Sequence, residues 1–372
     1  VNWYGAYARV GYSENMRYIS EAHITCSVEL NPKNIAATKD AIMNYGSVLA
    51  DYYSTSYGYN YLPNAVAFYQ NIYDSFNHEV VIVGWNDNFS RWNFNGNMVP
   101  PGNGAWLVKN SWAPDWGNGG GYFWMSYYER SLVSARIIDF DPINVADNNY
   151  SYDGDWANGL TYFWFPDFGP SHPIHTANVF TAKSDETLTE VGYYSLNTLG
   201  QLTVRVYVDP NEGDPMSGTF SSGLVTNVGE GYYNIKLNDP VQLKAGQKFS
   251  VVMEMINLVG GQYSYAVEEI NGDRATALPG QTYYLDPEEK IWYPDKWNAI
   301  IKAFTVSKEV DKSDLIRMVE VCDEFDIGTE VHYYNEAVRL INDENAGGQE
   351  VRNAYKRLLE FYRGQVGNSG FI

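Results

Sequence analysis

Two stretches decide the fold: HEVVIVGW at residues 78–85 and AWLVKNSW at residues 105–112. The first is a β-branched run with a titratable ring at its start, and the second is an apolar run that reaches a carboxamide. Both patterns are typical of buried strands. If the two strands are neighbours, they bring His78 and Asn110 to one edge of a sheet. The glycine-rich stretch WGNGGGYFW at residues 116–124 predicts a turn that leads into a third, aromatic strand.

An imidazole beside a carboxamide has a chemical use. A cysteine nucleophile reacts as its thiolate, a nearby imidazolium lowers the pKa of the thiol, and a third group must orient the ring. Asn110 can orient the ring without adding charge, and Trp112 can keep water from the His–Asn hydrogen bond. The alternative is that His78 only caps a strand and Asn110 only closes a turn. That alternative explains each residue alone but not the whole set.

Taken in this order, these residues resemble the C-terminal half of a papain-like cysteine peptidase. The resemblance implies that His78 is the catalytic base and acid and that Asn110 orients it. It also implies that Trp112 shields their hydrogen bond and that Trp116 forms a wall of the site on the leaving-group side.

The segments around this stretch extend the resemblance. A helix is predicted to begin at Asn31 or Asn34 and to end at Gly46, followed by a strand over residues 47–53. Papain-like enzymes place a helix and a strand of this kind before the catalytic histidine. Phe76 and Asn77, next to His78, are implied to shape the substrate pocket.

The nucleophile does not fit the same pattern. Only 77 residues precede His78, whereas the cysteine of papain-like enzymes lies about 130–150 residues before the His and Asn. Cys26 lies in an apolar context that suits a buried small hydrophobe, and Cys322 lies in a helical pattern that suits a core position. The oxyanion-hole glutamine of the family is not found either. We therefore expect that the nucleophile lies on a missing or separately processed N-terminal segment. The alternative is that the chain is a truncated or inactive form of the peptidase.

Composition limits the possible classes of protein. The chain has 372 residues, enough for two or three domains, and 45% apolar with 19% charged residues indicates a globular protein. Its 25 basic and 45 acidic residues give a net charge of −20, which argues against nucleic acid and anionic membranes as partners. No apolar run reaches the roughly 18 residues of a membrane span.

Strand alternation dominates the middle of the chain. One face is predicted to carry Leu202, Val204, Val206 and Val208, and a second strand repeats the pattern from Phe249 to Met255. Many short strands of this kind predict an antiparallel, jelly-roll-like β-sandwich. The stretches ANVFTA (residues 177–182), VGYY (191–194) and VQLKAG (241–246) resemble the lectin-like β-sandwich of some bacterial surface cysteine proteases.

The lectin-like resemblance implies a glycan partner, from the cell wall or from a host. Trp156 or Trp164 could stack on a sugar ring, although tryptophan in a sandwich also serves as core. Side chains of a type that Ca²⁺ accepts stand nearby, at Asn148, Asn149, Asp153 and Asp155. Their spacing matches no known loop, so calcium is an open alternative to the expectation of no cofactor and no metal site.

The end of the chain is predicted to be helical. Leu315, Val319 and Cys322 share one face of a first helix, and similar apolar positions mark two more helices. The run from Glu336 to Tyr355 resembles the three-helix FIVAR modules of secreted bacterial surface proteins.

The expected fold class is α+β in three domains. They are a papain-like β-barrel lobe over residues 1–145, a lectin-like β-sandwich over 146–307 and a three-helix bundle over 308–372. The leading hypothesis is an extracellular or cell-surface cysteine endopeptidase that acts on proteins or peptides together with an N-terminal, cysteine-bearing chain. The alternative is a non-catalytic glycan- or surface-binding protein that carries a peptidase remnant.

Overall fold

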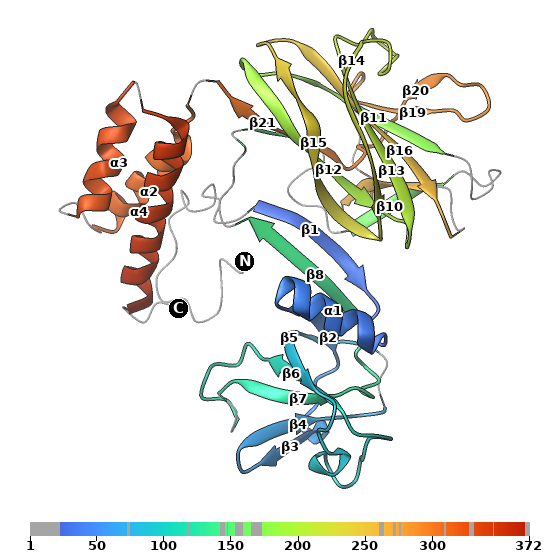
Figure 1. Cartoon of the computed structure of the whole chain (residues 1–372), viewed down its shortest axis with the longest axis vertical. Helices are drawn as coiled ribbons and strands as arrows, with labels where there is room; N and C mark the ends of the chain where they lie inside the picture. Colours follow the sequence, from blue (N-terminus) through green and yellow to red (C-terminus); the bar gives the residue numbers. More distant parts are fainter. Residues whose placement is uncertain are drawn as a thin grey trace.

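The computed structural model describes residues 23–72, 75–117, 120–141, 146, 148–152, 159–164, 173–259, 264–270, 273–274, 277–308, 310–326, 331–344 and 346–368. In this part of the chain, strands form two β-rich regions and three helices gather near the C-terminus (Figure 1). The predicted α+β class is therefore confirmed. None of the helices described is long and apolar enough to cross a membrane.

One long sheet runs through both β-rich regions. In order across the sheet, its described strands are β3 (Tyr59–Leu62), β4 (Ala65–Phe68), β7 (Tyr122–Ser126), β6 (Ala105–Lys109), β5 (His78–Asn86), β2 (Val48–Tyr52), β8 (Ser134–Asp141), β1 (His23–Leu30), β15 (Gly231–Leu243), β12 (Glu186–Ser195), β21 (Ile301–Ser307) and β9 (Asn148–Tyr150). The two stretches that decide the fold are β5 and β6, and they are neighbours, as predicted.

A helix covers the first β-rich region. Helix α1 (Ile35–Tyr45) begins after Asn34, whose side chain accepts a hydrogen bond from the Ala37 N–H at 3.2 Å, and ends at Gly46 with φ 84°. Both ends were predicted from the cap residues. Its buried face packs into one apolar core with β2, β5 and β6. This core holds β5 and β6, the strands that carry His78 and lead to Asn110, in place.

The predicted papain-like β-barrel is not closed. Among the described strands, β3 ends the sheet on one side, while β1 pairs with β8 on one edge and with β15 on the other. A barrel closes only when its first and last strands hydrogen-bond to each other. Here the second edge of β1 is taken by β15, with Val28 opposite Gly231, so the sheet continues into the second region.

The second region is an antiparallel β-sandwich, as predicted. A second sheet contains, in order, β14 (Thr219–Val228), β13 (Gly200–Val208), β16 (Lys248–Asn257), β11 (Ile174–Thr181), β19 (Thr282–Leu285) and β20 (Trp292–Pro294), and a small third sheet contains β10 (Gly159–Trp164), β17 (Ser264–Ile270) and β18 (Asp273–Arg274). Side chains from β12 and β15 share one core with side chains from β13 and β16. The predicted inward faces of β13 and β16 are buried there.

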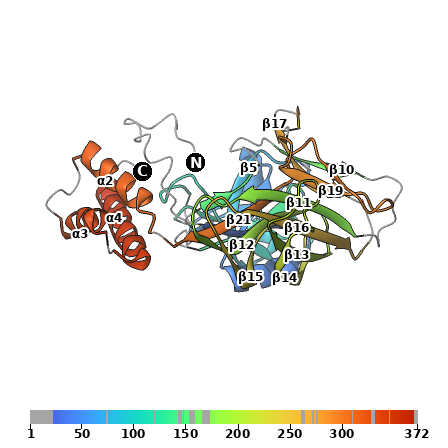
Figure 2. The same ribbon diagram turned by 90° about the horizontal axis from the view of Figure 1, so that it is seen from above.

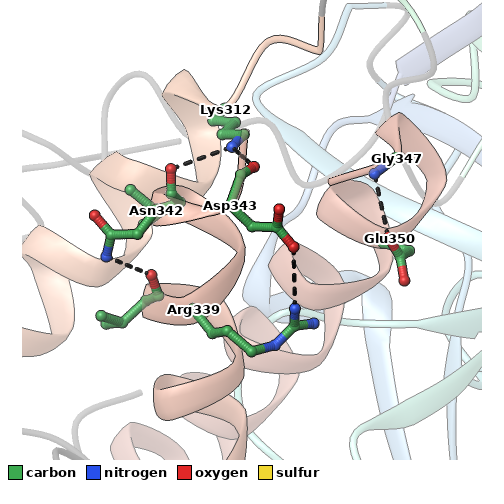
Figure 3. A network of polar contacts seen from close by, with 8 residues as sticks. Lys312, Arg339, Asn342, Asp343, Gly347 and Glu350 are labelled. Atoms are coloured by element: carbon green, nitrogen blue, oxygen red, sulfur yellow. Dashed lines mark hydrogen bonds and ion pairs between the residues drawn. The ribbon is translucent and has the colours of Figure 1, made fainter. Parts of the chain in front are cut away.

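The three C-terminal helices share one apolar core. They are α2 (Ser313–Glu324), α3 (His332–Asn342) and α4 (Gly348–Asn368), and Figure 2 shows them together at one end of the view. Figure 3 shows the polar contact between the start of α2 and the end of α3: Lys312 Nζ donates to the carbonyl oxygens of Ile341 at 3.2 Å and Asp343 at 2.5 Å. The lysine thus satisfies carbonyls at the C-terminal end of α3. The likeness to FIVAR modules and the three domain boundaries stay predictions.

The polar insert between β5 and β6 has structure of its own. It contains a short 3₁₀ helix, η3 (Arg91–Asn93), and places Phe89 and Phe94 in a small core with Ala67 and Tyr69. The two phenylalanines lie in a stretch without strand or helix periodicity, so the pattern gave no sign of their burial.

Candidate active site

The predicted dyad lies at the ends of two neighbouring strands inside the sheet. His78 is the first residue of β5, Asn110 follows the last residue of β6, and the two strands are antiparallel, with Val81 opposite Lys109. The start of β5 therefore meets the end of β6. The distance from Nε2 of His78 to Oδ1 of Asn110 is 2.9 Å, and Asn110 is only 3% exposed. The pairing expected from the sequence is present in the geometry.

The hydrogen bonds of Asn110 decide the tautomer of His78. The backbone N–H of Ser111 donates to the same Oδ1 atom at 2.8 Å, so the atom that faces it must be an oxygen. An oxygen cannot donate to His78, so Nε2 carries the hydrogen. A neutral imidazole has only one N–H, which leaves the lone pair on Nδ1. No residue in the described part of the chain is hydrogen-bonded to Nδ1.

Asn110 also has an unsatisfied group. Its Nδ2 is buried and has no hydrogen-bond partner among the described residues. A buried donor without a partner costs about 1–3 kcal/mol. Among the described residues, the amide of Asn110 thus places its oxygen on His78 and leaves its NH₂ group without a partner.

Trp112 lies against one face of the imidazole. Its ring stacks on the ring of His78 with 5.0 Å between centroids and 25° between planes. Trp116 packs edge-on against Trp112 at 5.1 Å. Trp112 is 40% exposed, so it lies between the His–Asn hydrogen bond and solvent.

The two residues before His78 behave differently from each other. Phe76 is 58% exposed. Asn77 forms a reciprocal pair with the backbone of Ser54: its Oδ1 accepts from the Ser54 N–H at 2.7 Å, and its Nδ2 donates to the Ser54 carbonyl at 3.3 Å. This pair connects the end of β2 with the start of β5. The sequence analysis did not predict the contact, although a polar run after a strand is a signal for such turns. The roles of both residues in a substrate pocket stay predictions.

Both cysteines lie away from this site. Cys26 is in β1, which is separated from β5 by β8 and β2, and burial raises the pKa of its thiol. Cys322 is fully buried in the core of the helical bundle, and burial raises the pKa of its thiol to about 12. A raised pKa disfavours the thiolate that a nucleophile needs.

The structure describes two of the four calcium candidates, Asn148 and Asn149. No group of three or more His, Cys, Asp or Glu side chains is placed to hold a metal ion in the residues described. Asn148 uses its amide to donate to Glu186 at 2.7 Å and to Ser307 at 3.1 Å, while Asn149 lies exposed in β9. The other two calcium candidates, Asp153 and Asp155, and Trp156 lie outside the described residues, and Trp164 ends β10.

Two parts of the chain match models of known protein families. Residues 7–137 match the model of the papain family of cysteine proteases, and residues 161–305 match the model of the lectin-like domain. No curated protein sequence matches the chain significantly.

Two solved structures are similar over most of the chain. One is a cysteine-to-alanine variant of the clostridial cysteine protease Cwp84 after propeptide cleavage, with 26% identity over 81% of this chain and 75% of that one and a TM-score of 0.66. The other contains the cysteine protease and lectin-like domains of Cwp84, a surface layer associated protein of Clostridium difficile. It has 25% identity over 80% of this chain and 66% of that one, and a TM-score of 0.62. The chain thus joins a papain-family cysteine protease domain to a lectin-like domain.

Proposed function

We propose that this chain supplies the catalytic histidine and asparagine of a cysteine endopeptidase. The observation that carries the proposal is the 2.9 Å contact between Nε2 of His78 and Oδ1 of Asn110, because in a neutral imidazole this contact puts the hydrogen on Nε2 and leaves the lone pair on Nδ1. An imidazole in this state can take the proton of a thiol and leave a thiolate–imidazolium pair.

The reaction proceeds by acyl transfer. The thiolate attacks the carbonyl carbon of the scissile peptide bond, the C–N bond breaks, and the Nδ1–H of His78 gives its proton to the departing amine. Nδ1 then takes a proton from water, the resulting hydroxide attacks the thioester, and the carboxylic acid product and the thiolate are released. Throughout, Asn110 holds the ring, and Trp112 keeps water from competing for the His–Asn hydrogen bond.

The thiolate comes from a polypeptide segment other than the one that carries Cys26 and Cys322. Two observations support this part of the proposal. Burial raises the pKa of both thiols, and both lie in elements that do not border His78. The partner is a cysteine-bearing segment of the same precursor, bound over the exposed side of the dyad.

The similarity to Cwp84 supports a proposed location for the enzyme. Cwp84 is a surface layer associated protein, and this chain has the same pair of domains in the same order. We therefore place the enzyme outside the cell or at the cell surface, where the lectin-like domain would bind a glycan and hold the peptidase near protein substrates. The proposal includes no resident cofactor.

A second candidate function is binding without catalysis. The match of residues 161–305 to the lectin-like domain favours it, because a glycan-binding protein needs no nucleophile. The two functions differ in whether a reactive thiol depends on His78.

A thiol-reactive peptidyl probe tests the proposal on the natural material. Intact mass is measured under native and denaturing conditions, for the wild-type chain and for His78→Ala, with His332→Ala as the control because His332 is exposed on α3. We expect a second polypeptide that co-purifies with the chain and takes the label, with labelling lost in His78→Ala only. An unlabelled chain without a partner would leave binding as the function.

A further inference from the structure

Four aromatic rings form a closed cycle of contacts around the site. Tyr52 lies opposite His78 in the β2–β5 pairing, is fully buried, and packs edge-on against the imidazole with 5.6 Å between centroids. Trp112 contacts the imidazole from the exposed side. The imidazole therefore has one aromatic neighbour in the core and one toward solvent.

Tyr59 completes the cycle. Its hydroxyl and that of Tyr52 are hydrogen-bonded at 2.5 Å, and its ring lies 6.0 Å from Trp112 and 5.6 Å from Trp116. Ser54 Oγ lies 3.2 Å from the same Tyr59 hydroxyl. The path from His78 through Trp112, Tyr59 and Tyr52 back to His78 thus contains only direct contacts.

The hydroxyl groups need an explanation that packing does not give. Two phenylalanines would fill the same space in the core without polar atoms to satisfy. A buried hydroxyl group must find a partner, and here each tyrosine is the partner of the other. Their bond joins the end of β2, next to His78, to the start of β3, beneath Trp112.

We propose that Tyr52 and Tyr59 are positioning residues that hold the His78 imidazole and its Trp112 cover in the reactive arrangement. The proposal deepens the function proposed above and rests on it. If the imidazole turns about its Cβ–Cγ bond, Nε2 leaves Asn110 and Nδ1 leaves the path of the thiol. The hydroxyl pair resists this rotation from the core, and it fixes the ring that supports Trp112. The geometry therefore assigns part of the orientation of His78 to residues that touch no substrate atom.

Solvent exchange of the His78 Nε2–H proton tests the proposal in the full chain. The chain is labelled with ¹⁵N-histidine, and the signal of His78 is identified by its loss in His78→Ala. The variants are Tyr52→Phe and Tyr59→Phe, each of which removes the same hydroxyl pair. Tyr69→Phe is the control, since Tyr69 is a buried tyrosine of the same region that packs on Phe94, outside the cycle. The imidazole N–H of His175, which donates to Glu254 at 2.9 Å in the lectin-like domain, is an internal reference.

We expect exchange of the His78 proton to become about tenfold faster in both variants, the factor that corresponds to one lost hydrogen bond. The His175 proton and the Tyr69→Phe control should not change. Equal exchange in all variants would overturn the proposal. Faster exchange at both His78 and His175, or loss of the fold in both variants, would also overturn it, because the hydroxyl pair would then serve general stability.

The measurement is independent of the nucleophile. If the peptidyl probe finds no thiol partner but exchange changes as expected, the proposed function fails while the positioning role of the tyrosines stands. If the probe succeeds and exchange does not change, only the role of the tyrosines fails. In the assembled enzyme, the positioning role further predicts a lower kcat with KM nearly unchanged in Tyr59→Phe.

Discussion

At the scale of single residues, one oxygen atom decides the chemistry of the site. Oδ1 of Asn110 accepts from the backbone of Ser111 and from His78, and this fixes which nitrogen of His78 carries the hydrogen. The strand patterns predicted that His78 and Asn110 meet. They did not predict the role of the Ser111 N–H, because a backbone group leaves no mark on the pattern of side chains.

Replacing Asn110 tests the orienting role. Asn110→Ala removes the acceptor for the Nε2–H, so the ring can turn, and kcat/KM of the assembled enzyme should fall on the order of 100-fold. Asn110→Asp keeps the acceptor for the Nε2–H, so its loss of kcat/KM should be smaller than that of Asn110→Ala even though it buries a charge. Hydrolysis of a fluorogenic peptide measures both. Wild-type activity in Asn110→Ala would contradict the role.

Glu129 is a fully buried carboxylate whose two oxygens both accept hydrogen bonds from the backbone. One accepts from the Gln70 N–H at 2.7 Å, and the other accepts from the Ser131 N–H at 3.0 Å and the Ser131 hydroxyl at 2.6 Å. In Glu129→Gln, an NH₂ group must face one of these donors. We expect a loss of about 1–3 kcal/mol in the free energy of unfolding, measured in urea. Glu79→Gln, at an exposed position, should change the free energy of unfolding by less than about 0.5 kcal/mol. Equal losses in the two variants would contradict a stabilising role for the hydrogen bonds of Glu129.

At the scale of elements, local signals predicted local structure. Gly46 predicted the end of α1, Asn34 was one of the two caps predicted for its start, and the β-branched run after His78 predicted β5. The barrel was wrong because closure depends on which strand takes the free edge of β1. That strand, β15, lies about two hundred residues away in the sequence, and its register is set by a contact that no periodicity encodes. The Tyr52–Tyr59 pair and the core around Phe89 and Phe94 were not predicted either, because no periodicity of the sequence encodes these contacts.

Gly231 makes the junction between β1 and β15 possible. Its φ is 140°, and a Cβ atom there would lie 2.2 Å from the Ser27 carbonyl oxygen and 2.8 Å from Val28 Cα. Gly231→Ala should therefore open this pairing, lower the free energy of unfolding by at least about 2 kcal/mol and speed amide exchange in β1 and β15.

A matched glycine separates the effect of the close contact from the effect of φ. Gly246 has φ 79°, and a Cβ atom there would meet nothing within 4 Å. Gly246→Ala should cost about 1 kcal/mol, the strain of the backbone alone, without faster exchange in β1. If the two variants behave alike in hydrogen exchange mass spectrometry, the contact across the junction is not what holds the strands.

Lys312 joins two helices of the bundle through carbonyl groups rather than through an acid. Lys312→Met keeps the apolar part of the side chain but leaves the carbonyls of Ile341 and Asp343 without their donor (Figure 3). We expect the free energy of unfolding of the bundle, measured by thermal unfolding, to fall by about 1–2 kcal/mol. Lys356→Met removes only an exposed pair with Glu360 at 4.0 Å and should cost less than about 0.5 kcal/mol. A larger effect at Lys356 would refute this account of the bundle.

At the scale of the whole molecule, the sheet links the dyad to the lectin-like domain. From β5 it passes through β2, β8 and β1 to β15 and β12, so both regions share one hydrogen-bonded surface (Figure 1). A glycan bound by the second region would thus place the peptidase region by way of strands rather than a loose linker. The composition predicted a chain of several domains, but nothing in it showed that two of them would share a sheet.

Peptide hydrolysis by the natural enzyme, with and without His78, tests the central claim most directly. Wild type, His78→Ala and the exposed control His332→Ala are compared with the partner segment bound and with equal folding verified by circular dichroism. The account predicts a loss of about a thousandfold or more in kcat/KM for His78→Ala and no change for His332→Ala. Activity retained in a folded His78→Ala variant would contradict the assignment of the site.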